Sequence, residues 1–471
     1  MSDALADTAP TPPMARLRGD LTQGPILKTL LAFSIPTLIS NLLQTLNGTI
    51  NSIWVGRLIG NSALAATANV NIVMFLTMAA VFGFGMATTV RVGQHFGARD
   101  VPAARATFGT GVGFCLIISV VVGLLGWRLS GPLLDALGTP GESRGEALDY
   151  LTVTFLTLPL GTLSIMVAMG LRGVGNSKLP LYAMILTVAI DVAMNPLLIR
   201  GIGPIPALGI TGSALSTATA NFAGCVAMIG WIYWKDLPLR LRGAELGWLW
   251  PRRNELAYVI TKGLPMGAQM LVVSSAGVVM VRLVNHEGAA TAAAYGAAMQ
   301  LWNYLQMPAF AIASGVSAMV AQNIGAGQHE RVKDITWQGL VSTTIFTISM
   351  ATLMVVFARA PLVLFLGSHS PALPIASHMQ AIVTWSYALT GIMMILSGTM
   401  RAYGAVITPL VVIFISLYPV RLGFYYAAYH WIGSEALWWA YPVGSAVSVA
   451  LMVGAYMRPG WREKVLLRGK K

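Results

Sequence analysis

The chain alternates long apolar stretches with short polar segments that are rich in glycine, proline and arginine. A membrane hydrocarbon core of roughly 30 Å needs about 20 mostly apolar residues per helix. Stretches of this length occur twelve times. The pattern therefore predicts twelve transmembrane helices, over residues 27–55, 62–90, 104–127, 147–170, 179–199, 209–233, 255–283, 289–320, 333–357, 373–399, 408–430 and 435–457.

The glycine, proline and arginine positions repeat along the chain. Such residues mark kinks, turns and helix ends, so their repetition indicates a duplicated helical plan. The stretch VGQHFGA from Val92 matches VAQNIGA from Val320 at a shift of 228 residues. A shift of 229 residues superposes Pro36 on Pro265, Pro132 on Pro361, Gly138 on Gly367, Arg172 on Arg401, Gly175 on Gly404 and Pro180 on Pro409.

Each half holds six predicted spans, and an even number returns the chain to its starting side. The halves should therefore share one orientation and be related by an axis along the membrane normal. The predicted fold is an all-α membrane protein with two parallel six-helix lobes. Its predicted parts are a disordered cytoplasmic tail (1–24), an N-terminal lobe (25–233), a cytoplasmic linker (234–254), a C-terminal lobe (255–457) and a basic cytoplasmic tail (458–471).

Composition and charge agree with this fold. Of 471 residues, 56% are hydrophobic and only 10% are charged, whereas soluble proteins carry about 25% charged residues. With the N-terminus inside, 23 of the 30 lysines and arginines fall on the cytoplasmic side and six on the other, while Arg421 lies within a span. This bias predicts that both termini are cytoplasmic, in a bacterial-type inner membrane. The net charge of +13 is thus a topology signal and does not indicate nucleic-acid binding.

One acidic residue, Asp191, falls deep within a predicted span. Ionisable side chains at membrane depth are costly and are functional candidates. Thr187, Asp191 and Asn195 form one polar stripe on the fifth span, because residues four apart share a helix face. A second stripe on the first span contains Thr37, Ser40, Gln44, Asn47 and Asn51.

If the two stripes face each other, Asp191, Asn195 and Asn51 form an oxygen-rich pocket to which Thr217 of the sixth span adds a hydroxyl. Such a pocket holds either a proton on the carboxylate or sodium through hard oxygen ligands. The alternative for Asn51 and Thr217 is a purely structural role as hydrogen-bond partners between helices.

Three arginines near helix ends or within spans have their own interpretations. Arg421 either fixes packing or tunes the electrostatics of a cavity, and Arg172 and Arg401 are expected to cap helix ends. Enzyme chemistry is disfavoured, because the six histidines show neither metal-ligand spacing nor a nucleophile–base pair. A nucleotide-driven pump is disfavoured by the lack of a Walker motif, and the two cysteines, Cys115 and Cys225, suggest no disulfide framework.

The chain resembles the multidrug and toxic compound extrusion (MATE) family over residues 25–457. The resemblance is carried by IPTLISNLLQTLNGTINSIWVGRL from Ile35, VGQHFGA from Val92, LRGVGNSKLP from Leu171, MNPLLI from Met194 and their second-half counterparts. It implies antiport of drugs or metabolites, as amphipathic or cationic small molecules, against protons or sodium. It implies no other cofactor, and we expect a monomer.

The resemblance also assigns residues. It places ion coupling, with sodium as one candidate ion, on Asn51, Asp191, Asn195 and Thr217, and helix bending on Pro36. Gln44, Asn47, Thr187 and Arg421 are expected in the substrate cavity. The chain departs from the family pattern, because Asn51 replaces a first-span acid and the usual fifth-span order of Asn then Asp is reversed.

Val273 and Thr390 or Gly391 stand where the NorM-type branch has acids in its C-terminal lobe, so the chain resembles the DinF-like branch more closely. The alternative function is a flippase for lipid-linked precursors, which usually calls for more cationic residues in its cavity than Arg421 alone.

Overall fold

The computed structural model describes residues 19–136, 138–139, 141–201 and 206–462, and in this part the chain is helical throughout. Eleven of the described helices are long and apolar enough to cross a membrane, and the number is twelve if a pair of helices bent at a short break counts as one span. The prediction of an all-α membrane protein is thereby confirmed. The predicted tail residues 1–18 and 463–471 lie outside the described residues.

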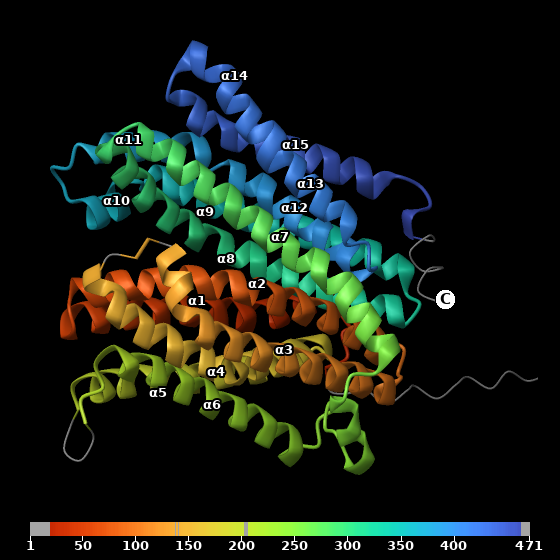
Figure 1. Cartoon of the computed structure of the whole chain (residues 1–471). Helices are drawn as coiled ribbons and strands as arrows, with labels where there is room; N and C mark the ends of the chain where they lie inside the picture. The colour runs from red at the N-terminus through yellow and green to blue at the C-terminus, as the bar shows by residue number, and fades with distance from the viewer. Residues whose placement is uncertain (1–18, 137, 140, 202–205, 463–471) are drawn as a thin grey trace, which may run out of the picture.

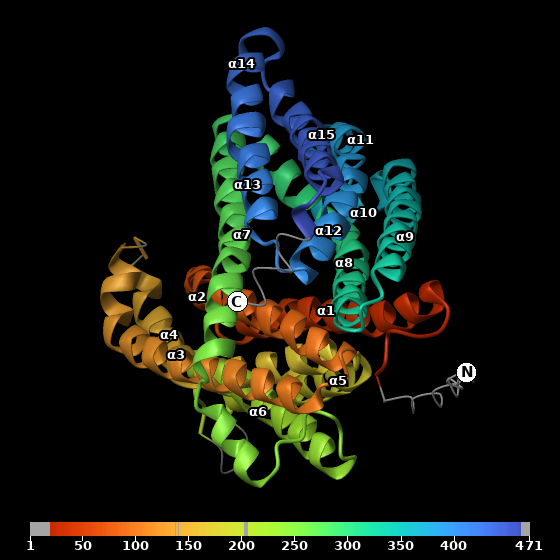
Figure 2. The ribbon, with the colours of Figure 1, turned by 90° about the vertical axis from the view of Figure 1, so that its right-hand side faces the viewer.

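The helices form two groups that run at a steep angle to each other (Figures 1 and 2). The first group, here the N-lobe, contains α1 (Ile26–Leu58), α2 (Asn61–Gly97), α3 (Val101–Ala136), α4 (Gly141–Gly173), α5 (Lys178–Arg200) and α6 (Gly209–Trp234). The second group, here the C-lobe, contains α7 (Arg253–His286), α8 (Ala289–Gly325), α9 (His329–Val356), α10 (Arg359–Leu366), α11 (Ala372–Val383), α12 (Ser386–Ala402), α13 (Ile407–Ile415), the π-helix η2 (Ser416–Leu422), α14 (Gly423–Ile432) and α15 (Glu435–Met457).

Two spans predicted as continuous helices are irregular. The tenth is broken between α11 and α12 with a bend of 45°. The eleventh contains the wide turns of η2, which surround Pro419. Proline has no backbone N–H and cannot complete the regular hydrogen-bond ladder, so the backbone adjusts locally. Sequence periodicity does not report such local changes. Arg421 lies within η2 and therefore owes its position to this irregular turn.

The two lobes make a close backbone contact where α2 of the N-lobe crosses α8 of the C-lobe. The two repeated motifs, from Val92 and from Val320, form this crossing, and a glycine of each motif packs against the backbone of the other. A Cβ atom added to Gly97 would lie 1.9 Å from the carbonyl oxygen of Gln322, and one added to Gly325 would lie 1.9 Å from that of Gln94. Glycine is required on both sides because only its absent side chain lets the two backbones touch.

The glutamines of the two motifs also connect the lobes. Gln94 Nε2 donates to the carbonyl oxygen of Ala402 at 2.8 Å, and Gln322 Nε2 donates to that of Gly173 at 3.0 Å. Ala402 ends α12 and Gly173 ends α4, so each motif holds the last turn of a helix in the opposite lobe. We call this end of the molecule the crossing end. Among the described residues, all hydrogen bonds between the lobes lie at this end.

Residues 19–24 pack on the molecule, whereas the sequence predicts that they belong to a disordered tail. Leu21 and Thr22 are buried, and the backbone N–H of Leu21 donates to Gln322 Oε1 at 2.9 Å. Arg99 forms an ion pair with Asp20 at 2.6 Å. The pKa of Asp20 is lowered because hydrogen bonds from Thr22 and Arg99 outweigh the opposing effect of its burial.

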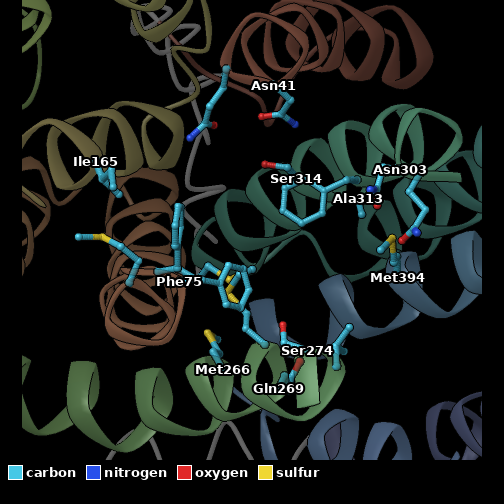
Figure 3. A pocket seen from close by; sticks show the side chains of 18 of the residues that line it. Asn41, Phe75, Ile165, Met266, Gln269, Ser274, Asn303, Ala313, Ser314 and Met394 are labelled. Carbon is cyan, nitrogen blue, oxygen red and sulfur yellow. The ribbon is translucent and has the colours of Figure 1, made fainter. Parts of the chain in front are cut away.

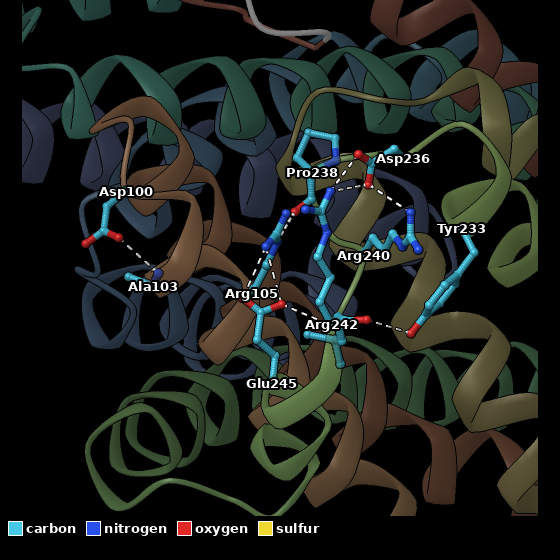
Figure 4. A network of polar contacts seen from close by, with 10 residues as sticks. Asp100, Ala103, Arg105, Tyr233, Asp236, Pro238, Arg240, Arg242 and Glu245 are labelled. Carbon is cyan, nitrogen blue, oxygen red and sulfur yellow. Dashed lines mark hydrogen bonds and ion pairs between the residues drawn. The ribbon is translucent and has the colours of Figure 1, made fainter.

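The predicted linker, 234–254, is held on the N-lobe by polar contacts (Figure 4). Arg105 of α3 donates to the carbonyl oxygen of Pro238 at 2.8 Å and pairs with Glu245 at 3.1 Å. Glu245 belongs to the short helix η1 (Gly243–Leu249), which packs against α3. Hydrogen bonds from Arg242 lower the pKa of Asp236. The linker is therefore an ordered part of the N-lobe rather than a flexible tether.

Candidate functional site

A large cavity lies between the two lobes. Its volume is about 1310 Å³, and its walls come from both lobes. Figure 3 shows Asn41, Phe75 and Ile165 on the N-lobe side, facing Asn303 and Met394 on the C-lobe side. Methionine is frequent in its lining, and this flexible, polarizable side chain adapts to differently shaped apolar ligands. The cavity is therefore suited to amphipathic small molecules.

Asp191 lies beside this cavity, behind its wall. Its side chain is fully buried on α5, one turn from Thr187 and one turn from Asn195. The polar stripe of α5 faces the polar stripe of α1 and the small, polar residues of α6. Asp191 is thus enclosed by polar side chains of three helices, in an otherwise apolar lobe.

The Asp191 carboxylate accepts hydrogen bonds from four side chains. Asn47 Nδ2 and Asn51 Nδ2 of α1 donate to Oδ2 at 2.7 and 2.8 Å. Ser216 Oγ of α6 donates to Oδ1 at 2.7 Å, and Thr217 Oγ1 lies 3.3 Å from both oxygens. The carboxylate is thus held by amide donors of α1 and hydroxyl donors of α6.

Two oxygen atoms of the cluster are buried without a hydrogen-bond donor among the described residues. They are the side-chain amide oxygens of Asn47 and Asn195. Asn195 instead uses its Nδ2 to donate to Asn51 Oδ1 at 2.9 Å. A buried acceptor without a partner costs free energy unless some group satisfies it. Uncharged amide oxygens next to a carboxylate are the ligands that a hard cation prefers, so the side chains present fit a sodium ion.

The structure places the other predicted residues as follows. Gln44, Thr187, Thr217 and Arg421 line the cavity, whereas Asn47, expected there, contacts Asp191 instead. Thr217 lies between Asp191 and the cavity, since it contacts the carboxylate and also lines the cavity. Pro36 is buried within α1, three turns before the Asp191 cluster begins at Asn47.

Ser216 is a member of the cluster that its sequence position does not predict, and two arginines lie elsewhere than predicted. Ser216 directly precedes Thr217 on α6. A serine at this position could either pack between helices or donate a hydrogen bond to Asp191, and the sequence contains no signal that separates these two roles. Arg172 and Arg401, expected to cap helix ends, extend into the cavity and line it. Both have side chains long enough to reach past the last helical turn into the polar cavity instead of folding back onto carbonyl groups.

The C-lobe has no equivalent of the Asp191 cluster. At the repeat positions of Asp191, Asn51 and Asn47 it has Val420, Met280 and Ala276, of which Met280 and Ala276 are fully or almost fully buried. Arg421 lies there instead, with its guanidinium 4.3 Å from the centre of the Tyr441 ring. Tyr441 in turn shares a 2.6 Å hydrogen bond with Tyr295. The duplicated halves have thus diverged into an acidic N-lobe site and an aromatic, cationic C-lobe site.

We expect that Ser216→Ala increases the apparent affinity for the coupling cation about tenfold. In the cation-free state, Ser216 gives the carboxylate a hydrogen bond, and a hydrogen bond to a charged group contributes about 1.5–3 kcal/mol. Its loss destabilises the cation-free state, and about 1.4 kcal/mol corresponds to a factor of ten. The measurement is the cation concentration that gives half-maximal transport.

The matched control for this variant is Ser213→Ala, which removes a buried hydroxyl one turn away on the same helix. This control should leave the half-maximal concentration unchanged. A Ser216→Ala protein with an unchanged or higher half-maximal concentration would contradict the assigned role of Ser216.

Comparisons with known proteins cover nearly the whole chain. The family model MatE matches residues 36–197 and 265–427, once in each lobe. A probable multidrug resistance protein, YoeA of Bacillus subtilis, is 31% identical over 445 residues, which cover 94% of this chain and 96% of that protein. An FAD transporter of Shewanella oneidensis is 26% identical over 84% of this chain and 86% of its own length.

Solved structures share the fold. A crystal structure of a MATE protein in the bent conformation superposes with a TM-score of 0.85 at 20% identity, over 96% of this chain and 98% of that one. An outward-facing multidrug resistance MATE family transporter gives the same TM-score, 0.85, at 20% identity over the same shares. At this level of identity the likeness shows the two-lobe fold alone.

Proposed function

The chain belongs to the MATE family of membrane transporters, which are not enzymes, and we propose that it exports amphipathic or cationic small molecules by antiport against sodium or protons. The observation that carries the antiport proposal is Asp191, a carboxylate buried deep in a membrane lobe beside the cavity between the lobes. A lone buried acid in such a place is a natural binding site for a small cation.

The polar cluster supports sodium over the proton as the coupling cation. Asp191 is surrounded by four amide and hydroxyl side chains, each of which also bears an oxygen atom. The amide oxygens of Asn47 and Asn195, buried without a hydrogen-bond donor among the described residues, are hard oxygen ligands of the kind that sodium prefers. Asn51 and Thr217 complete the set of oxygen-bearing neighbours. Sodium would thus exchange with the hydrogen-bond donors that now surround the carboxylate.

The transport cycle follows from the position of this cluster. Thr217 both contacts Asp191 and lines the cavity, so a change around Asp191 alters the surface that the substrate contacts. Pro36 weakens the backbone ladder of α1 and provides a point at which the helix bends. Cation and substrate must favour different states of the lobes, because a ligand that binds both states equally shifts nothing.

The distribution of basic residues supports an orientation with both termini in the cytoplasm, in a bacterial-type inner membrane. In this orientation the crossing end is cytoplasmic, so the hydrogen bonds that join the lobes among the described residues lie on the cytoplasmic side. Val273 and Thr390 line the cavity at positions where acids would otherwise stand, which supports a place nearer the DinF-like branch. We propose that a monomer is sufficient, because the cavity and the cluster are both formed within one chain.

The alternative is a flippase for lipid-linked precursors. The cavity supports it more strongly than Arg421 alone would, because Arg172 and Arg401 line the cavity together with Arg421. The Asp191 cluster favours cation-coupled export instead. The two functions differ in whether transport of a soluble compound depends on a cation gradient.

Everted membrane vesicles provide the test. We expect ethidium to accumulate inside such vesicles, since everted vesicles import what cells export, and we expect dissipation of the sodium gradient to stop the accumulation. Dissipation of the proton gradient alone should leave it largely intact. The reverse dependence would assign the proton as coupling ion. Accumulation that survives the loss of both gradients would contradict antiport.

A further inference from the structure

The charge of the cavity points to the kind of substrate that it binds. Among the described residues that line it are three arginines, Arg172, Arg401 and Arg421, and no aspartate, glutamate or lysine. Asp191 is fully buried behind the wall, where it is already surrounded by hydrogen-bond donors. An unbalanced positive charge in a membrane cavity is costly unless it has a partner. A ligand with a negative charge is such a partner.

Arg172 and Arg401 form a symmetric pair at the floor of the cavity. They are repeat equivalents, one in each lobe. Arg172 directly precedes Gly173, whose carbonyl oxygen accepts from Gln322, and Arg401 directly precedes Ala402, whose carbonyl oxygen accepts from Gln94. Both arginines therefore lie beside the crossing of α2 and α8, one on each side.

Neither guanidinium has an acidic partner in the part of the chain that the structure describes. Arg401 donates only to an uncharged amide, Gln269 Oε1, at 3.3 Å. Arg172 has no hydrogen bond or ion pair from its side chain there, and its Nε is buried without an acceptor. Arg421 also has a buried Nε without an acceptor among the described residues, but its guanidinium rests on the ring of Tyr441. The two floor arginines are thus charged donors without an acidic partner in the described part of the chain.

We infer that the cavity binds the anionic group of an amphipathic substrate, a phosphate or carboxylate, between Arg172 and Arg401. This inference rests on the proposed export function and narrows its substrate class to amphipathic molecules that carry an anionic group. Cations such as ethidium are then weaker ligands of the same cavity. Guanidinium groups bind such anions through two parallel hydrogen bonds each. The apolar part of the substrate would lie against methionine and phenylalanine side chains of the cavity wall, such as Phe75 and Met266.

The position of the pair also suits transport. Because the two arginines belong to different lobes, a movement of the lobes that opens the crossing changes the distance between the guanidinium groups. The anion is then held by both arginines in one state and by fewer in the other. Its affinity differs between the two states, which is the condition for a substrate to take part in alternating access.

The test compares three probes that share one apolar body, namely pyrenebutanoate, pyrenebutanol and pyrenebutyltrimethylammonium. Binding is measured by fluorescence on the purified full-length protein, with empty detergent micelles as the blank. We expect the anion to bind at least tenfold more tightly than the cation. The double substitution Arg172→Gln with Arg401→Gln should weaken anion binding at least tenfold and leave the binding of the alcohol unchanged.

The matched control is Arg128→Gln with Arg359→Gln, which removes the same total charge from exposed positions in the two lobes that do not line the cavity. This control should retain anion binding. If the double variant does not fold, the single variants and Arg172→Lys replace it, with an intermediate loss expected for each. Equal or tighter binding of the cation to the native protein, or full anion binding by the folded arginine variants, would overturn the inference.

Competition identifies the source of the anion. Displacement of pyrenebutanoate by phosphatidylglycerol and not by phosphatidylcholine would assign the site to a lipid headgroup, and displacement by phenyl phosphate alone would assign it to a free solute. Displacement by none of these anions would count against the site. These measurements need no ion gradient. Anion binding without gradient-coupled export would therefore refute the proposed function alone, and the opposite result would refute this inference alone.

Discussion

Replacement of Asp191 by asparagine is expected to abolish gradient-coupled efflux, with a loss of at least a hundredfold. Asparagine has the same shape but no charge, so a cation loses its main ligand. Cation binding can change the arrangement of the lobes only if the cation binds one arrangement more tightly than the other. Without Asp191 this difference in affinity is lost, and the gradient no longer powers transport. A loss of about 2.7 kcal/mol already corresponds to a factor of one hundred.

The measurement is ethidium efflux from cells and accumulation in everted vesicles, with the sodium and proton gradients dissipated separately. The control is Glu330→Gln, which neutralises an exposed acid at the start of α9, outside the cavity and the cluster. Binding of ethidium to the purified variant, measured without a gradient, shows whether the cavity is still formed. An Asp191→Asn protein that retains efflux under every gradient would disprove the assignment of the coupling site.

A single added methyl group at the crossing of α2 and α8 is expected to hold the cavity open at the crossing end. In Gly97→Ala the new Cβ would lie 1.9 Å from the carbonyl oxygen of Gln322, and in Gly325→Ala it would lie 1.9 Å from that of Gln94. Backbone atoms have little freedom to move aside, and overpacking typically costs about 1–3 kcal/mol. Each substitution should therefore depopulate the state with a closed crossing by about tenfold, and the double variant by more.

Cysteine labelling measures this shift directly. Ser314 lines the cavity on α8, and the native Cys115 and Cys225 are buried. In everted vesicles, a membrane-impermeant maleimide should modify Ser314→Cys about tenfold faster when Gly97→Ala is also present. Efflux should fall in parallel.

The control for the crossing is Gly230→Ala with Gly454→Ala, at helical glycines where an added Cβ meets nothing within 4 Å. This pair should change neither labelling nor efflux. Equal labelling rates in the crossing variants and in this control would show that the crossing is not the gate.

The sequence by itself determined the class of the protein, its duplication and the acid at its centre. Apolar stretches of membrane-spanning length must become helices, because the bilayer offers no partners for free backbone groups. The repeated glycines and prolines revealed the two halves, because few other residues can adopt the backbone conformations that glycine and proline provide at turns and kinks. Asp191 was evident from its isolation, since a charge in an apolar span is rare for energetic reasons.

Only the tertiary structure decided which polar groups meet. Ser216 and Thr217 are adjacent in the sequence, and packing of α6 against α5 brings Ser216 Oγ to 2.7 Å from the carboxylate. The orientation of the Arg172 and Arg401 side chains could not be predicted either. A side chain at a helix end can fold back onto the helix or extend into a cavity that the other lobe completes. Periodicity along one helix fixes which residues share a face. The partner of that face is set by contacts between distant segments, which local sequence does not encode.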